Sequence, residues 1–242
     1  MRHCAATQAW SGGYRHGRPR SVRPVPIGPA TTRPRAAWLL LLVLWAGYFL
    51  AAWLDVAVPV ERVLKGLLMP ALLLCVLATL RDRSPRWLAV GLVFATVGDI
   101  AIDVSFEAGL LGFLVMQVCY IVGFVGLGAT RTRSVRLAAA GYGLVWIVVN
   151  LVLGPTFGEL RIPVLIYSAA LCAMAALGAG VNARVEMGAA LFLISDTLIA
   201  CGQADLDFAG RSALVMPTYL AGQYLIATGW MRRIRRDVWV PV

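Results

Sequence analysis

Two aspartates lie well inside apolar stretches of this sequence, in similar surroundings. The segment Gly91-Leu-Val-Phe-Ala-Thr-Val-Gly-Asp99 carries one, and Gly188-Ala-Ala-Leu-Phe-Leu-Ile-Ser-Asp196 carries the other with the same glycine-to-aspartate spacing. A charged side chain is costly in hydrocarbon, so such residues usually face the interior of a helix bundle and mark a functional site. We therefore take Asp99 and Asp196 as candidate catalytic residues.

Further polar side chains lie at a similar depth in neighbouring apolar stretches: Lys65, Gln117, Tyr120, Tyr167, Tyr219 and Gln223. Such groups can simply hold helices together by hydrogen bonds, but uncharged residues would do so at a lower desolvation cost. Two carboxylates beside one cation form an acid/base pair, in which one carboxyl group keeps its proton and the other stays ionised near Lys65. The pattern alone leaves hydrolysis, proton-coupled transport and ion conduction open. Asp103, one turn beyond Asp99 and near the end of its stretch, is expected to be merely solvated.

The composition predicts a membrane protein. The chain is 60% hydrophobic and 14% charged, and its mean hydropathy is +0.78, whereas soluble domains have about 45–50% apolar and about 25% charged residues. The net charge of +10 could suggest a nucleic-acid partner, but the arginines lie in short loops and tails between apolar stretches. That distribution is typical of membrane topology, and we expect no nucleic-acid partner.

Eight apolar stretches follow one another, each close to the roughly 20 residues that a helix needs to cross a bilayer. They lie at about 37–54, 60–80, 86–104, 109–128, 135–153, 162–181, 186–202 and 212–231. The fold class predicted is therefore all-α, a polytopic bundle of eight transmembrane helices over residues 37–231. We expect a disordered Arg/Pro-rich tail at 1–36 and a basic tail at 232–242.

The charges between the stretches predict an orientation. Most of the 22 basic residues lie in the two tails and in alternate loops, while the other loops carry mainly Asp and Glu. By the positive-inside rule both termini are cytoplasmic, and the location expected is the plasma membrane. The shared glycine-to-aspartate spacing also suggests two parallel four-helix repeats.

Several short motifs carry a resemblance to a known family. They are Lys65 with Met69-Pro70, Phe94 with Gly98-Asp99, Gly112-Phe113 through Tyr120, Tyr167 with Met174, Gly188 to Phe192 with Ser195-Asp196, and Tyr219 with Gln223. Over about residues 38–231 the chain resembles the YhhN / lysoplasmalogenase family of integral membrane proteins. One position departs from the pattern: the family usually has a histidine three residues before the helix-four tyrosine, and this chain has Gln117, which can form hydrogen bonds but cannot titrate.

The resemblance implies hydrolysis of the vinyl-ether bond of a lysoplasmalogen, or a related ether lysolipid, to a fatty aldehyde and a glycerophospho-alcohol. Asp99 and Asp196 would then be the acid and the base, in an order that the sequence leaves open. Lys65 would serve the ionised carboxylate or the lipid phosphate, and Gln117, Tyr120, Tyr167, Tyr219 and Gln223 would hold water and the glycerol oxygens. The lysophospholipid would enter from the bilayer, and no metal or organic cofactor is required. The alternatives are a proton-coupled transporter or lipid-binding protein that uses the same polar layer, and a structural membrane protein.

Overall fold

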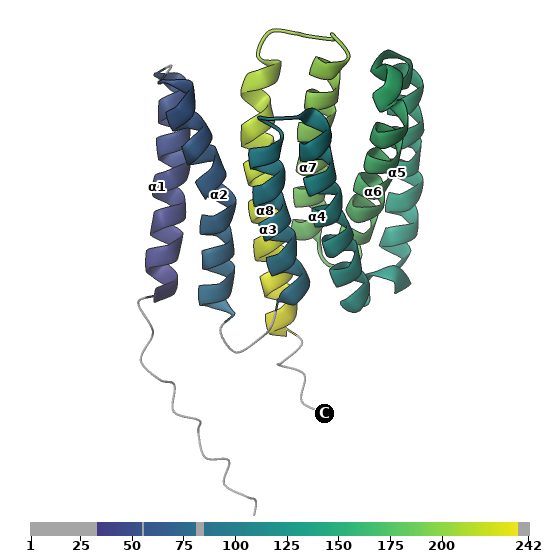
Figure 1. The fold of residues 1–242 in the computed structure, drawn as a ribbon. Helices are drawn as coiled ribbons and strands as arrows, with labels where there is room; N and C mark the ends of the chain where they lie inside the picture. The colour runs from purple at the N-terminus through teal and green to yellow at the C-terminus, as the bar shows by residue number, and fades with distance from the viewer. Residues whose placement is uncertain (1–32, 55, 81–84, 237–242) are drawn as a thin grey trace, which may run out of the picture. The chain divides into compact units, whose positions relative to one another are not determined.

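A computed structural model describes residues 33–54, 56–80 and 85–236, and in these residues the chain is helical. Its α-helices are α1 (Arg33–Trp53), α2 (Val58–Thr79), α3 (Arg86–Ala101), α4 (Phe106–Gly126), α5 (Arg133–Val152), α6 (Arg161–Gly178), α7 (Ala183–Gln203) and α8 (Arg211–Arg236). Two 3-10 helices, η1 (Ala129–Arg131) and η2 (Gly154–Leu160), lie on either side of α5. Successive helices run in opposite directions (Figure 1). The all-α prediction is confirmed for the described residues; most of the tail predicted at 1–36, and residues 237–242, lie outside them.

Several helices begin before their apolar stretches do, at a polar residue that caps the first turn. The Ser105 hydroxyl accepts a hydrogen bond from the backbone N–H of Ala108 at the start of α4, and Thr132 caps α5 through Val135. The Asn182 side chain accepts from the N–H groups of Arg184 and Val185 at the start of α7. Such caps satisfy backbone donors that the first helical turn leaves free. The helices therefore begin two to three residues before the predicted 109, 135 and 186.

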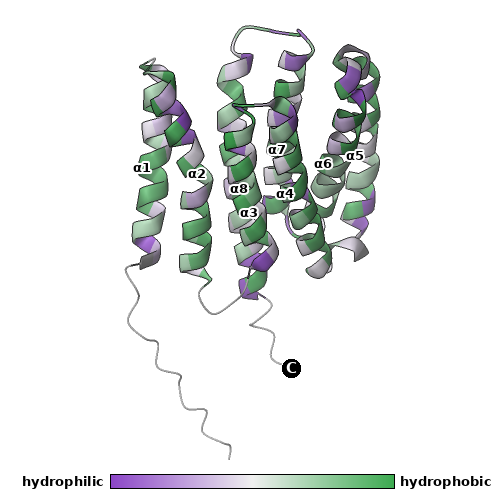
Figure 2. Ribbon diagram, in the orientation of Figure 1, coloured by the Kyte–Doolittle hydropathy of each residue, from purple (hydrophilic) through white to green (hydrophobic). Residues whose placement is uncertain are grey.

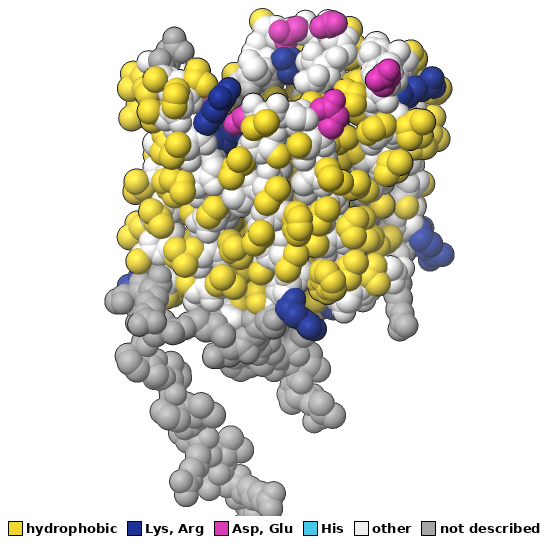
Figure 3. All heavy atoms as spheres, in the orientation of Figure 1, with side chains coloured by type: hydrophobic (Ala, Val, Ile, Leu, Met, Phe, Trp, Pro, Cys, Tyr) yellow, Lys and Arg dark blue, Asp and Glu magenta, His cyan; other side chains and the backbone are white. Residues whose placement is uncertain are grey.

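The helices are those of a multi-pass membrane protein. Six of those in the described ranges have the length and hydropathy of membrane spans: α1, α2, α4, α5, α6 together with η2, and α7. Apolar residues cover most of each helix in Figure 2, and large exposed ones such as Leu39, Val63, Leu111 and Leu144 face outward. On the face in Figure 3, hydrophobic side chains fill the middle and acidic side chains gather at one end. Because α3 has 16 residues and α8 does not meet the hydropathy criterion, the number of eight crossings stays a prediction.

Helix α8 lies at the centre of the bundle, and its closest neighbour is α7. Gly188 of α7 and Gly222 of α8 face each other, and a Cβ atom on either would lie within 3 Å of the other's carbonyl oxygen. The Asn182 side chain also donates to the Gly229 carbonyl oxygen of α8 at 3.0 Å. Small residues let the two backbones approach this closely, as is common between membrane helices.

The helix contacts repeat with an offset of four helices. The pairs α1–α2, α2–α3 and α3–α4 pack together, and so do their counterparts α5–α6, α6–α7 and α7–α8. The contact between α2 and α8 likewise has its counterpart between α6 and α4. This pattern agrees with the four-plus-four repeat that the two Gly-to-Asp segments suggest. Helix α5 is peripheral, with no fully buried residue along its described length.

Candidate active site

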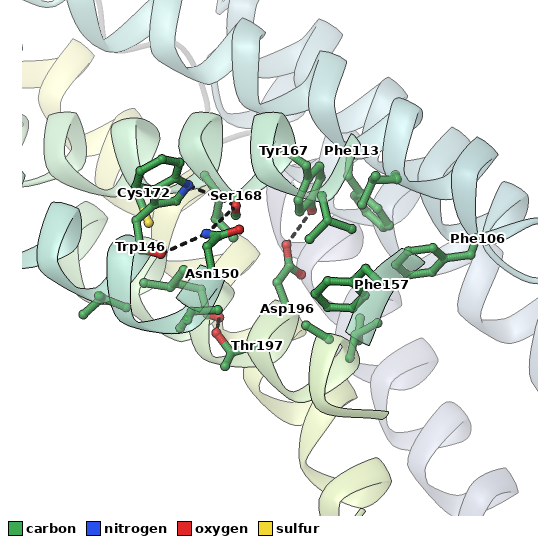
Figure 4. Close-up of a pocket in the computed structure, with 18 of the residues that line it drawn as sticks. Phe106, Phe113, Trp146, Asn150, Phe157, Tyr167, Ser168, Cys172, Asp196 and Thr197 are labelled. Carbon is green, nitrogen blue, oxygen red and sulfur yellow. Dashed lines mark hydrogen bonds between the residues drawn. The ribbon is translucent and has the colours of Figure 1, made fainter. Parts of the chain in front are cut away.

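Asp196 and Tyr167 line a cavity that is otherwise mainly apolar. The cavity lies among α4, α5, η2, α6 and α7 and is walled largely by Phe, Leu, Ile and Val side chains. The Tyr167 hydroxyl donates a hydrogen bond of 2.5 Å to Oδ2 of Asp196 (Figure 4). The cavity volume is about 60 Å³, which is room for a few water molecules. A carboxyl group and a phenol thus meet in an apolar cavity with room for water.

The buried faces of two neighbouring helices place these groups. On α6 the buried residues recur every three or four positions, at Val164, Tyr167, Leu171 and Met174, so the Tyr167 side chain points inward. On α7 the buried face includes Phe192 and Ser195, and Asp196 lies at its edge, where the carboxylate stays half-buried next to the cavity. The Ser195 hydroxyl donates to the Val215 carbonyl oxygen of α8, which fixes this part of α7.

Asp99 lies apart from the cavity, in the packed core. Its carboxylate is 3% exposed and accepts a hydrogen bond of 2.8 Å from the Tyr219 hydroxyl. The Tyr219 ring packs edge-on against Phe113, with ring centroids 5.9 Å apart, and Phe113 also lines the cavity. Phe113 therefore stands between the Asp99–Tyr219 pair and the cavity. The two carboxylates do not share a hydrogen bond, because each accepts from a different tyrosine.

Tyr120 and Gln223 join α4 to α8 in the same core. The Tyr120 hydroxyl donates to Oε1 of Gln223 at 2.8 Å, and Nε2 of Gln223 lies 3.1 Å from the Met116 sulfur. Gly91 of α3 leaves room for the Tyr120 ring, since a Cβ atom there would lie 2.3 Å from it. These residues fill the bundle interior and do not reach the cavity wall described above.

Gln117 is buried beside Tyr167 but is not paired with it. The residue is fully inaccessible, and its amide lies close to the Tyr167 phenol. Neither amide atom forms a hydrogen bond of normal geometry with any described residue. A buried amide without hydrogen-bond partners lowers the stability of the folded protein, because its desolvation is not compensated.

Lys65 lies with Asp103, not with Asp99 or Asp196. Its ammonium nitrogen donates to Oδ1 of Asp103 at 2.8 Å, and both side chains are partly exposed. Asp103 is exposed, as expected, but it is not merely solvated, because its carboxylate forms an ion pair between α2 and the turn that follows α3.

The structure also shows polar cavity residues that the sequence analysis missed. Trp146 and Asn150 of α5 and Ser168 of α6 line the cavity with Asp196 (Figure 4). The Ser168 hydroxyl accepts from Trp146 Nε1 at 3.1 Å and from Asn150 Nδ2 at 3.2 Å. The sequence contains a pattern that could have identified this helix face: Tyr142, Trp146 and Asn150 are spaced four residues apart and therefore lie on one side of a helix.

The arrangement suits acid/base chemistry on an amphiphilic molecule. A carboxyl group within reach of water can donate a proton and take one back. The apolar wall would accept a hydrocarbon chain, and the few polar groups would orient the reacting part, as is usual in small-molecule sites.

Comparisons with known proteins agree on one family. The model described as the YhhN family matches residues 60–230. Two curated proteins named lysoplasmalogenase, from Mycobacterium bovis and Mycobacterium tuberculosis, are each 31% identical to this chain. The matches cover 61% of this chain, and the chain spans 61% of the length of each of these relatives. No solved structure matches the chain.

Proposed function

The chain belongs to the YhhN family, and from this membership and the geometry of the cavity we propose that it hydrolyses the vinyl-ether bond of a lysoplasmalogen or a related ether lysolipid. The products are a fatty aldehyde and a glycerophospho-alcohol. The observation that carries the proposal is the Asp196–Tyr167 pair in an apolar cavity. The name of the two mycobacterial relatives supports the same substrate class.

Asp196 is the proton donor in this proposal. An apolar surrounding favours the neutral form of a carboxyl group, and the Tyr167 hydrogen bond fixes its orientation. The Asp196 proton goes to the β-carbon of the vinyl ether, whose π electrons form the new C–H bond. This leaves an oxocarbenium ion next to the Asp196 carboxylate, which stabilises the positive charge as carboxylates do in glycosidases.

The same carboxylate then acts as the base. Water attacks the oxocarbenium carbon and gives its proton to Asp196, which restores the starting acid and leaves a hemiacetal. The hemiacetal breaks its C–O bond to the glycerol, with its hydroxyl proton moving to the departing oxygen. One water is consumed, and no cofactor is needed for this balance.

Asp99 has a supporting role in this proposal, because it does not line the cavity. Its hydrogen bond holds Tyr219, and Tyr219 packs against Phe113 in the cavity wall. The buried Tyr120, Gln223 and Gln117 support the wall in the same way rather than touching the lipid.

We further propose that the protein spans the plasma membrane eight times with both termini in the cytoplasm. Arg133 and Arg184 lie in the first turns of α5 and α7, and the last turn of α8 carries several arginines at the same end, whereas the opposite end carries fewer bases, among them Arg161 and Arg211. The acidic Glu107, Glu159 and Asp207 lie at the starts of α4, in η2 and in the α7–α8 connection. This asymmetry supports the positive-inside orientation.

The test is release of fatty aldehyde from a lysoplasmalogen by the purified protein in detergent. The wild-type protein should release fatty aldehyde from this substrate. Asp196→Asn should lose activity by at least about a hundredfold, because loss of a general acid typically costs about 10²–10⁴-fold. Tyr167→Phe and Asp99→Asn should retain measurable activity, since Tyr167 only orients Asp196 and Asp99 only supports the cavity wall through Tyr219.

Folding of each variant is checked by its elution as a single species in detergent. Equal turnover by wild type and Asp196→Asn would refute the mechanism. Absence of turnover by folded wild type would instead favour the transporter or lipid-binding alternative, which predicts lipid binding that requires Asp196 without product formation.

A further inference from the structure

Asn150 presents one unused hydrogen-bond acceptor to the cavity. Its Nδ2 group donates to the Trp146 carbonyl oxygen at 2.8 Å and to the Ser168 hydroxyl at 3.2 Å, which uses both of its hydrogens. No described residue donates to its Oδ1. In Figure 4 this oxygen lies on the side of the amide that faces Asp196.

The hydrogen-bond partners of Asn150 show which end of its amide is the oxygen and which is the nitrogen. A backbone carbonyl oxygen can only accept, so the atom of Asn150 next to the Trp146 carbonyl must be the NH₂ group. The Ser168 hydroxyl is also committed: it accepts from Trp146 and Asn150, and it donates to the Leu165 carbonyl oxygen at 3.1 Å. The two hydrogen bonds of its NH₂ group therefore hold the Asn150 amide, and with it the oxygen, in place.

We propose that Asn150 Oδ1 holds the water molecule that attacks the oxocarbenium ion; this role rests on the function proposed above. The cavity has room for a few waters and is mainly apolar elsewhere. A water between Asn150 and Asp196 donates one hydrogen to the amide oxygen and the other to the carboxylate. Its lone pair is then directed at the reacting carbon, and its proton leaves to Asp196. Because a neutral amide takes no proton, Asn150 is a positioning residue.

This role predicts a specific failure when the amide is removed. Protonation of the β-carbon by Asp196 does not need Asn150, so the oxocarbenium ion still forms. Capture by water becomes slower, and the bond between the two former vinyl carbons, which is single in the ion, has time to rotate. The ion then returns to vinyl ether by losing its original β-hydrogen to Asp196. In D₂O, where Asp196 carries deuterium, the recovered substrate then contains deuterium at the β-carbon.

The experiment compares wild type, Asn150→Leu, Ser168→Ala and Thr96→Val in D₂O, with lysoplasmalogen as substrate. Aldehyde release and deuterium in the unreacted substrate are both measured by mass spectrometry. Asn150→Leu should lower kcat about tenfold or more and should deuterate the recovered lipid. Ser168→Ala, which loosens the amide but keeps its oxygen, should do both to a smaller extent.

Thr96→Val is the control. Thr96 of α3 does not line the cavity, and its hydroxyl donates to the Leu92 carbonyl oxygen of its own helix. It should behave like wild type, with no deuterium in the recovered substrate.

Two results would overturn the role of Asn150. One is an Asn150→Leu variant with kcat within about twofold of wild type. The other is a slow variant whose recovered lipid contains no deuterium, because a structural defect slows turnover without exposing the intermediate. Absence of aldehyde from wild type would overturn the proposed function itself, and this role with it; aldehyde from wild type with either of the first two results would overturn the role alone.

Discussion

The Tyr219 hydroxyl of α8 donates a hydrogen bond of 2.8 Å to Oδ2 of Asp99 on α3, 120 residues away along the chain. Both residues are buried, and the Tyr219 ring also contacts Phe113 and Phe192. The bond therefore ties the central helix to α3 and keeps in place the aromatic ring behind the cavity wall. Its loss should affect stability and cavity geometry together.

Tyr219→Phe should lower the free energy of unfolding by about 1–3 kcal/mol, because it leaves the buried Asp99 carboxyl group without its donor. Stability is measured by thermal unfolding of the protein in detergent. Tyr142→Phe is the control: Tyr142 lies half-buried on the peripheral α5 and forms no hydrogen bond among the described residues. In the double variant Asp99→Leu/Tyr219→Phe the two losses should be less than additive. Full additivity would show that the bond contributes nothing.

Gln117→Met should stabilise the protein. Both amide atoms of Gln117 are buried without a hydrogen-bond partner among the described residues, and methionine fills a similar volume without that cost. We expect a gain of about 1 kcal/mol, which for a chain of this size raises the Tm by about 2–4 °C. Gln223→Met is the matched control and should destabilise, since it removes the partner of the Tyr120 hydroxyl. A lower Tm for Gln117→Met would mean that its amide is hydrogen-bonded after all.

The helices and the two aspartates inside them could be predicted from the sequence, because hydropathy and the cost of placing a charge in hydrocarbon are both read from neighbouring residues in the chain. Asp99 and Asp196 stand out in apolar stretches whatever the neighbouring helices are. Which partner each carboxylate meets depends on helix packing, and this was not predictable: Asp99 meets Tyr219 and Asp196 meets Tyr167. The helix starts were placed too late because capping residues such as Asn182 are polar and lie outside the apolar stretch.

The exposed and half-exposed polar residues were the harder part. Lys65 was expected near the aspartates because it lies at their depth, yet its long side chain pairs with Asp103 at the bundle end. Asn150 was missed because a single amide in an apolar helix gives little signal by itself. The amide of Asn150 is oriented by a hydrogen bond to Ser168 on the next helix, and sequence alone does not place those two residues opposite each other.

The connection between α7 and α8 should carry a small pH-dependent contribution to stability. The Arg211 guanidinium donates to Asp207 at 2.8 Å and holds the pKa of that exposed carboxyl group below its ordinary value. A lowered pKa means that the contribution is present above about pH 4, the ordinary Asp pKa, and is lost as the pH falls through the lower folded-state value. Asp207→Asn should therefore have a slightly lower Tm than wild type at pH 7, and the difference should vanish once the pH lies below the lowered folded-state pKa of Asp207. A difference that persists in acid would assign the stabilisation to something other than the ion pair.

Gly188→Ala should separate α7 from α8 and displace Asp196 with it. A Cβ atom at Gly188 would lie 2.7 Å from the Gly222 carbonyl oxygen and 2.8 Å from the Ile226 backbone nitrogen, and backbone atoms cannot move aside as a flexible side chain can. Overpacking of this kind costs about 1–3 kcal/mol. Gly141→Ala on α5 is the matched control, because nothing lies within 4 Å of its added carbon, so helix propensity alone should stabilise it by about 0.5–1 kcal/mol. The two Tm shifts should have opposite signs, and aldehyde release should fall in Gly188→Ala, because the moved helix carries Asp196 away from Tyr167. Equal Tm shifts in the two variants would show that the α7–α8 contact does not depend on the missing side chain.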